Sequence, residues 1–141
     1  MNSDIKTKVL VIGIVKDGDK ILMRKKPDGS PPYKETWYLF GGELKPSMTV
    51  NQAIIDEVKA KAGIEISVTQ QLSWDTEVKR DLDGEVKQFI YLDTICKYEG
   101  GDLTPSHDIE RLEWVPVSKL DEYDIVPPSK ILFNKLGYYN S

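Results

Sequence analysis

A pair of glycines, Gly41-Gly42, precedes a segment with helical periodicity that runs from Thr49 to Ala62. Two glycines between a strand and a helix let the backbone approach a ligand and offer N–H groups to an anion, although they also suit a plain turn. Because each helical residue advances by about 100°, Glu57 and Lys61 fall inside the apolar arc of this segment. The arc contains Val50, Ala53, Ile54, Ile55, Val58, Ala60 and Ala62, and the opposite face carries Gln52, Asp56 and Lys59.

Two opposite charges, Glu57 and Lys61, are therefore expected to face the body of the protein. A buried charge without a partner is energetically costly, so each of these side chains needs either a counter-ion or access to solvent in a cleft. One interpretation is an ion pair between residues i and i+4 at the rim of the core. The other is that this face of the helix borders a ligand cleft.

The whole segment resembles the Nudix box, whose pattern is Gly, five residues, Glu, seven residues, Arg-Glu, an aliphatic residue, any residue, Glu-Glu, any residue, Gly and an aliphatic residue. Aligned from Gly42, the spacing fits without a gap, and the matching positions are Gly42, Glu57, Val58, Gly63 and Ile64. Met48 stands for the first Glu, Asp56 for the Arg, and Ala60 and Lys61 for the paired Glu residues. Family-like sequence also flanks the box, in Lys20–Arg24, in Trp37–Gly42 and in Trp114-Val115-Pro116.

This resemblance implies a fold of the α/β class, a Nudix-type α/β/α sandwich with a mixed β-sheet, as a single Nudix-like domain over residues 1–141. Proteins of this MutT-like hydrolase family cleave a nucleoside diphosphate linked to another group, with water and divalent cations, usually Mg²⁺. The metal ions neutralise the diphosphate and position the attacking water.

The substitutions within the box change the charge available for a metal. Mg²⁺ prefers oxygen ligands, and carboxylates at positions i, i+3 and i+4 of a helix point to one place. Those positions are Glu57, Ala60 and Lys61, so one donor is kept, one is deleted and one is replaced by a cation. The ammonium repels a metal ion and is expected to pair with Glu57. We therefore expect a site that attracts phosphate but is impaired in Mg²⁺-dependent hydrolysis.

The resemblance gives the candidate residues their roles. Glu57 is the candidate catalytic residue, Glu57 and Asp56 are the candidate metal ligands, and the candidate ligand-binding residues are Arg24, Gly41, Gly42 and Lys61. Arg24 suits a phosphate because a guanidinium fork matches phosphate oxygens. The expected ligand is a small nucleotide or related phosphorylated molecule. The alternative is an active pyrophosphohydrolase that uses Mg²⁺ or Mn²⁺ at a rearranged site, in which Glu57 is joined by Asp56, Glu43, Asp108 or Glu110.

Other chemically capable residues have simpler interpretations. Lys25 and Lys26 are typical of a solvated strand end. His107 lies in a polar loop, and Cys96 lies in an apolar strand as a small buried side chain without a histidine partner. At most two of the aromatic residues are expected to touch a ligand, the candidates being Trp37, Tyr38, Phe40, Trp74 and Tyr91.

The remaining elements follow from strand patterns and turn residues. A hairpin is predicted from strands at 8–15 and 20–25 around Asp17-Gly18, then a short strand at 36–40 that Gly41-Gly42 ends. Strands at 67–79 and 85–98 flank a second turn at Asp83-Gly84, and a further strand is predicted at 111–117. A last helix begins at Pro127 or Pro128 and ends at Leu136 before Gly137.

Composition bounds the class of protein. The chain has 141 residues, a net charge of −4, one Cys and one His, which excludes a disulfide framework and a histidine-rich zinc site. No apolar run reaches the roughly 20 residues needed to span a bilayer, and residues 1–8 lack the apolar core of a signal peptide. Basic residues are spread along a mildly acidic chain, which argues against a dedicated nucleic-acid partner. We expect a cytoplasmic protein, either monomer or homodimer, with no membrane partner.

Overall fold

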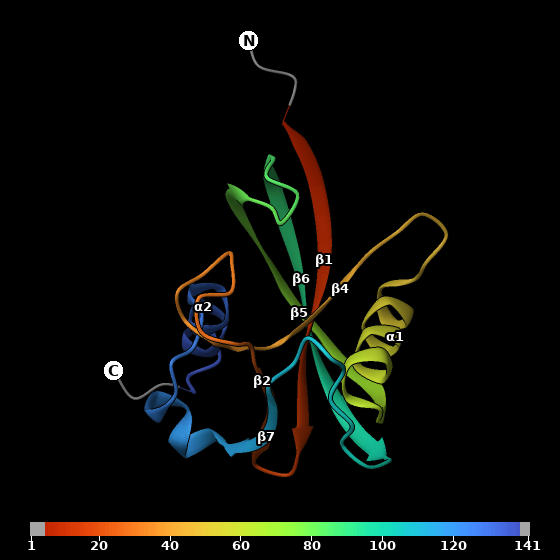
Figure 1. Cartoon of the computed structure of the whole chain (residues 1–141). Helices are drawn as coiled ribbons and strands as arrows, with labels where there is room; N and C mark the ends of the chain where they lie inside the picture. The colour runs from red at the N-terminus through yellow and green to blue at the C-terminus, as the bar shows by residue number, and fades with distance from the viewer. Residues whose placement is uncertain (1–4, 139–141) are drawn as a thin grey trace.

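A computed structural model describes residues 5–138, in which seven strands form one mixed sheet between two helices (Figure 1). Residues 1–4 of the N-terminal segment considered above lie outside the described range. The strands are β1 (Lys6–Asp17), β2 (Lys20–Lys25), β3 (Trp37–Tyr38), β4 (Phe40–Glu43), β5 (Glu65–Arg80), β6 (Val86–Gly100) and β7 (Arg111–Pro116). The helices are α1 (Val50–Ala62), a short 3₁₀ helix η1 (Val117–Glu122) and α2 (Pro127–Lys135).

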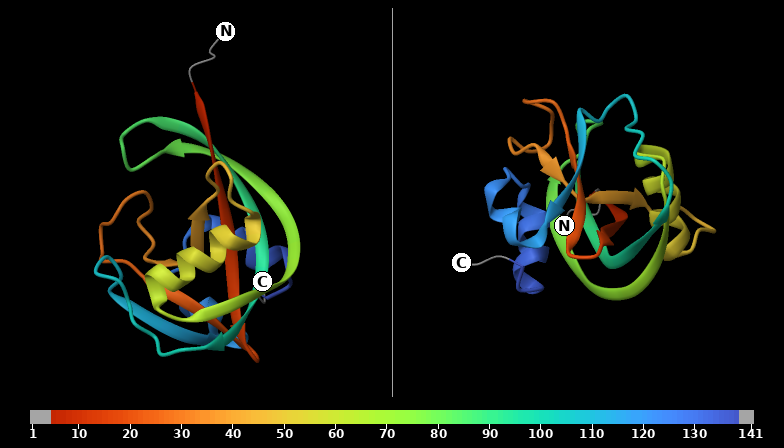
Figure 2. Two further views of the ribbon diagram at one scale, coloured as in Figure 1. Left: turned by 90° about the vertical axis from the view of Figure 1, so that its right-hand side faces the viewer. Right: turned by 90° about the horizontal axis from the view of Figure 1, so that it is seen from below.

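The sheet has the order β3-β2-β1-β6-β5, with β4 paired to β1 and β7 paired to β2. β1 and β6 are parallel and the other pairs are antiparallel, so the predicted mixed sheet is confirmed. Helix α1 covers one face and α2 the other, and the long β5–β6 hairpin curves between them (Figure 2). This arrangement confirms the expected α/β/α layers.

Each face of the sheet has its own apolar core. On one face, Ile54 and Val58 of α1 pack with a cluster that includes Val11, Val15 and Phe40. On the other, Leu132 and Phe133 of α2 pack with a second cluster that includes Ile14, Ile21 and Met23. Burial of such side chains stabilises the fold by roughly 1.5–3 kcal/mol each. The two cores fix both helices against one sheet.

The first hairpin forms as predicted, but its turn lies one residue later. Asp17 pairs with Lys20, so the two-residue turn is Gly18-Asp19 and Asp17 still belongs to the strand. Gly18 has a φ of 63°, the positive value that a tight hairpin turn requires at its first position. The position of the glycine, which can adopt this positive φ, therefore fixes the position of the turn.

Helix α1 begins and ends where the sequence indicates. The Thr49 side chain caps it by accepting a hydrogen bond from the Gln52 N–H at 3.1 Å, and Gly63 ends it with a φ of 76°. Ala60 is exposed, so its predicted place on the buried arc is wrong. Neither α1 nor any other helix in residues 5–138 has the length and apolarity needed to cross a bilayer.

The two glycines do not end a strand, contrary to prediction. Gly41 and Gly42 lie inside β4 and pair with Ile12 and Val11 of β1. A Cβ at Gly42 would lie 2.5 Å from the backbone oxygen of Ala53 and 3.0 Å from the Glu57 Cβ. Gly42 therefore allows α1 to lie directly on β4, which brings Glu57 close to the sheet.

Replacing Gly42 by alanine should lower the free energy of unfolding by about 1–3 kcal/mol, because the helix backbone must move to admit the methyl group. Gly41→Ala is the matched control, since its Cβ would meet only the end of the flexible Ile12 side chain, at 3.1 Å. Urea denaturation of both variants measures the difference. Equal stability of the two variants would contradict the close contact between α1 and β4.

Candidate functional site

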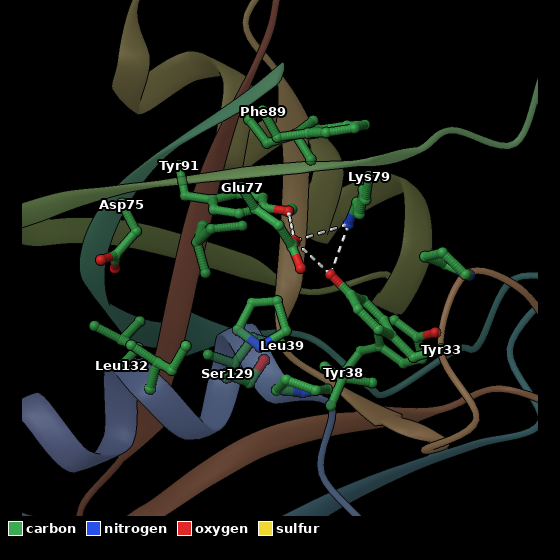
Figure 3. A pocket seen from close by; sticks show the side chains of 18 of the residues that line it. Tyr33, Tyr38, Leu39, Asp75, Glu77, Lys79, Phe89, Tyr91, Ser129 and Leu132 are labelled. Atoms are coloured by element: carbon green, nitrogen blue, oxygen red, sulfur yellow. Dashed lines mark hydrogen bonds and ion pairs between the residues drawn. The ribbon is translucent and has the colours of Figure 1, made fainter. Parts of the chain in front are cut away.

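A cavity of about 300 Å³ opens on the sheet face that α2 covers, beside the glycines of β4 (Figure 3). Its lining comes from elements that are far apart in the sequence. They include Arg24 and Lys26 at the end of β2, Gly41 of β4, the loop residue Tyr33 and residues of β5, β6 and α2. Of the predicted ligand-binding residues, Arg24 and Gly41 line the cavity, whereas Gly42 is buried against α1.

Arg24 is held firmly at the cavity wall. Its Nε donates a hydrogen bond of 2.9 Å to the Leu39 carbonyl, and its guanidinium lies 5.4 Å from the ring centroid of Tyr38. Burial lowers the pKa of Arg24, while the negative charges of Glu57 and Asp108 oppose that shift. Arg24 thus connects the cavity with the charged groups of α1.

The predicted pairing of Lys61 with Glu57 is wrong. The Lys61 Nζ donates to an Asp108 oxygen at 2.8 Å, across 47 residues of sequence. The Ser106 hydroxyl also donates to Asp108, and together these contacts hold the pKa of Asp108 well below its usual range. Glu57 has no hydrogen-bond or ion-pair partner among residues 5–138. The simple interpretation of an i,i+4 pair is therefore excluded.

Glu57 is a half-buried carboxyl surrounded by cations. Burial raises its pKa above the usual value, the positive charges of Arg24, Lys61 and Lys26 oppose this shift, and the negative charge of Asp108 adds to it. Three basic and two acidic side chains therefore interact electrostatically around Glu57. The cluster of Arg24, Lys26, Lys61, Glu57 and Asp108, called the charged cluster below, has a formal charge of +1. Such a cluster attracts an anion.

The side chains of the charged cluster do not fit a magnesium site of the three-carboxylate type. Among residues 5–138, no group of three His, Cys, Asp or Glu side chains is arranged to hold a metal ion. Two carboxylates, Glu57 and Asp108, are close enough to affect each other, and Lys61 already binds Asp108. A dication between them would face the repulsion of the nearby ammonium and guanidinium groups.

The other acidic candidates lie apart from Glu57 or have partners of their own. Asp56 is exposed and accepts a hydrogen bond of 2.6 Å from the Gln52 amide. Glu110 pairs with Lys25 at 2.8 Å, and Glu43 is exposed at the end of β4. Asp108 is among the charges that shift the pKa of Glu57, whereas Asp56, Glu43 and Glu110 are not.

Lys26 was predicted to be solvated, and this is wrong. Its ammonium lies 4.5 Å from the ring centroid of Tyr38, and burial lowers its pKa, with a further contribution from Arg24. Lys25 instead binds Asp28 and Glu110 away from the cavity. Lys26 therefore adds a positive charge to the cavity wall.

Two of the five aromatic candidates, Tyr38 and Tyr91, line the cavity. Trp37 and Phe40 are buried in the core, and Trp74 is 72% exposed. Cys96 is buried, as expected, and burial raises its pKa. His107 is exposed.

A hydrogen-bonded network crosses the cavity (Figure 3). The hydroxyls of Tyr33 and Tyr91 donate to one oxygen of Glu77, at 2.6 and 2.7 Å. The Lys79 Nζ donates to the Tyr33 hydroxyl at 2.8 Å and lies 4.7 Å from the ring centroid of Phe89. These contacts attach the loop that carries Tyr33 to β5, so they give the cavity a fixed wall.

The network was not predicted from the sequence, although its residues occupy alternate positions along two strands. On β5, the residues Asp75, Glu77 and Lys79 alternate along the strand and therefore share a face. On β6, Phe89, Tyr91 and Asp93 do the same. Only the packing of α2 and the Tyr33 loop shows that these charged residues line a cavity.

The family model described as NUDIX domain matches residues 5–136 of the chain. The chain is 24% identical to nucleoside triphosphatase NudI of Enterobacter sp. over 139 residues, which cover 94% of this chain and 99% of that protein. It is 30% identical to an ADP-ribose pyrophosphatase of Methanocaldococcus jannaschii over 113 residues. That match covers 79% of this chain and 63% of the relative.

Among solved structures, the MutT protein of Methanosarcina mazei Go1 superposes with a TM-score of 0.77 and 16% sequence identity. The superposition covers 96% of each chain. At this identity the match concerns the arrangement of strands and helices, which agrees with the layers described above.

Proposed function

Because the chain belongs to the NUDIX domain family, we propose that it binds a nucleoside diphosphate-linked or related phosphorylated small molecule. The phosphates lie near Arg24, Lys26 and Lys61, and the remainder of the ligand occupies the cavity. Ordinary Mg²⁺-dependent hydrolysis of the diphosphate is impaired, because box carboxylates that would hold the metal are replaced. Gly41 lines the cavity, so the backbone of β4 lies close to this site.

The single observation that carries the proposal is the set of three basic side chains around Glu57. In the family, divalent cations generally neutralise the substrate's phosphates, and here fixed cations of the protein supply positive charge in the same region. Guanidinium and ammonium groups form charge-assisted hydrogen bonds to phosphate oxygens, so they suit this role. They do not generate a metal-bound nucleophile, so we expect the protein to bind the ligand without hydrolysing it efficiently.

The names of the relatives support a nucleotide ligand. One is a nucleoside triphosphatase and another is an ADP-ribose pyrophosphatase, so each name refers to a phosphorylated nucleoside. The cavity here has the features such a ligand needs, namely basic residues at one end and aromatic residues along the wall. A ligand of this class fits a pocket of about 300 Å³ with mixed lining.

A second candidate is an active pyrophosphohydrolase with a rearranged Mg²⁺ or Mn²⁺ site. The observation in its favour is that Asp108 raises the pKa of Glu57, so two carboxylates share the region. Glu57 would be the catalytic residue, and Asp56, Glu43 or Glu110 would have to move toward it. This candidate requires release of Asp108 from Lys61.

Binding without a metal should be measurable directly. In EDTA, ADP or pyrophosphate should raise the Tm of the protein, because a ligand that prefers the native state stabilises it by mass action. Lys26→Met should weaken binding about tenfold, which corresponds to about 1.4 kcal/mol, while Lys130→Met on the exposed side of α2 should not. Calorimetric titration of the two variants measures the affinities.

A turnover assay separates the two candidates. With Mg²⁺ or Mn²⁺, a panel of nucleoside diphosphate derivatives should release no more product than buffer alone. Robust turnover that Glu57→Gln abolishes would establish the second candidate in place of the first. Absence of any stabilisation by ADP or pyrophosphate would contradict the proposed ligand class.

A further inference from the structure

The strand at one edge of the sheet has a free side. β5 ends the strand order, and β6 is its only strand partner among residues 5–138. The register between β5 and β6 shifts at three places before Trp74, and such irregularities blunt an edge. From Trp74 to Arg80 the register is regular. This segment, called the free edge below, therefore presents backbone N–H and C=O groups with which a further strand could pair.

The two faces of the free edge differ in chemistry. Asp75, Glu77 and Lys79 belong to the cavity lining and lie on that face together (Figure 3). Trp74 and Val78 alternate with them and therefore lie on the opposite face, where they are 72% and 59% exposed. Exposed apolar side chains beside an unpaired strand edge favour association with another chain. The free edge is therefore a candidate interaction surface.

The charges on the cavity face limit which strand can pair with the free edge. A like charge directly opposite Asp75 or Lys79 is destabilising, and an opposite charge is favourable. The occupant must therefore carry an acid and a base at matching positions. A second copy of β5 supplies both, because in a two-fold symmetric pair residue i contacts residue j and j contacts i.

Charge complementarity is best when the two-fold axis passes through Glu77. Asp75 of each copy then lies opposite Lys79 of the other copy, so two opposite-charge pairs form. Within its own chain Asp75 binds Lys135 at 2.6 Å and Lys79 lies 3.6 Å from Glu77, so these pairs join into a network. The single like-charge pair is Glu77 with its own symmetry copy, and each of these carboxylates has the ammonium of Lys79 beside it.

The neighbouring registers match less well. An axis at Thr76 places Asp75 opposite Glu77 twice, which gives two like-charge pairs and no opposite-charge pair on this face. An axis at Val78 places Asp75 opposite Asp81 twice, which cancels the two favourable pairs that Glu77 would form with Lys79. The register at Glu77 is therefore the one in which attraction exceeds repulsion.

We propose that the free edge binds a second copy of this chain, antiparallel about a two-fold axis at Glu77, so that two sheets join into one homodimer. On the exposed face, Trp74 then lies opposite Arg80 of the second copy, where a guanidinium can lie over the indole ring. Thr76 lies opposite Val78 of the second copy, and both are β-branched residues that suit a strand. The pairing completes the backbone hydrogen bonds of both edges.

The mass of the full chain in solution tests the dimer. The contact is short compared with standard interfaces of about 1,200–2,000 Å², so sedimentation is measured from low to high micromolar concentration. The mass should rise with concentration toward twice the 16.0 kDa of one chain. A wild-type protein that keeps the mass of one chain throughout would overturn the proposal.

A lysine at the free edge should weaken the dimer. Val78→Lys should raise the dissociation constant of the dimer at least about tenfold, because a charged edge side chain opposes strand pairing. Ile5→Lys is the matched control, since Ile5 is also an exposed apolar residue, 44% exposed, but adjoins β1, which β6 separates from β5. It should dimerise as the wild type does. Circular dichroism checks that both variants fold, and equal dimerisation of the two would overturn the proposal.

Cysteine pairs test the register. In the double variant Thr76→Cys/Val78→Cys, each new cysteine faces the other type across the axis, so mild oxidation should link the two copies. Neither single variant should be linked, and the wild type is the control because its Cys96 is buried. Linking of Thr76→Cys alone or of Val78→Cys alone would place the axis at that residue and overturn the register. Absence of linking in the double variant would overturn it as well.

Discussion

Replacing Lys61 by glutamate should give the protein a response to divalent metal ions that the wild type lacks. K61E changes the local charge by two units and puts a carboxylate one helical turn from Glu57, facing Asp108. Three carboxylates would then be gathered, which is the donor set that Mg²⁺ and Mn²⁺ prefer. Adding either ion should raise the Tm of K61E by several degrees and leave that of the wild type unchanged.

The same substitution should weaken metal-free binding of pyrophosphate, by at least about tenfold, because an attractive charge becomes a repulsive one. Lys130→Glu makes the same charge reversal on the exposed side of α2 and serves as the control. Thermal unfolding with and without metal, and titration with pyrophosphate in EDTA, measure the two effects. An equal metal response in the wild type and K61E would show that Lys61 does not govern metal binding.

Asp93→Asn should stabilise the protein near neutral pH. Burial raises the pKa of Asp93 to about 6, from the ordinary 3.8, and the Ser73 hydroxyl only partly offsets that effect. Two units of pKa correspond to about 3 kcal/mol of penalty for keeping the carboxylate charged in the folded state. An asparagine side chain stays neutral and can still accept the hydrogen bond from Ser73.

The pH dependence of this effect has a definite sign. Because the folded-state pKa is raised, the folded protein binds more protons than the unfolded chain between about pH 4 and pH 6. The penalty is therefore absent below pH 4, grows as the pH rises, and is complete above pH 6. The stability advantage of Asp93→Asn should be largest at pH 7–8 and vanish near pH 4.

Urea denaturation across this pH range measures the advantage, with Asp121→Asn as the exposed control. A constant difference between Asp93→Asn and the wild type from pH 4 to pH 8 would contradict the burial of a costly carboxylate. The result also bears on function, because acids with strongly shifted pKa values cluster at functional sites. A residue that lowers stability in the free protein yet lines the cavity is a candidate of this kind.

Local patterns in the sequence were sufficient for most of the fold. The helical periodicity from Thr49 to Ala62 predicted α1 to within one residue, and strand patterns predicted β1, β2, β5, β6 and β7 to within a few residues. These features depend on residues close together in the chain, so their periodicity and turn chemistry are visible without a structure. The errors fell where a tertiary contact decided the outcome, as at Gly42, which continues a strand because α1 lies directly on it.

By itself, the sequence determined that this chain has a Nudix-like box in which Glu57 remains, and that Ala60 and Lys61 stand where carboxylates would be. Only the tertiary structure decided that Lys61 binds Asp108 and that Lys26 belongs to the cavity. It also decided that Asp75 and Asp93 line the cavity. The physical reason is that a charge takes its partner from whichever segments converge around it. That convergence is set by the packing of α1, α2 and the Tyr33 loop on one sheet, which no local pattern contains.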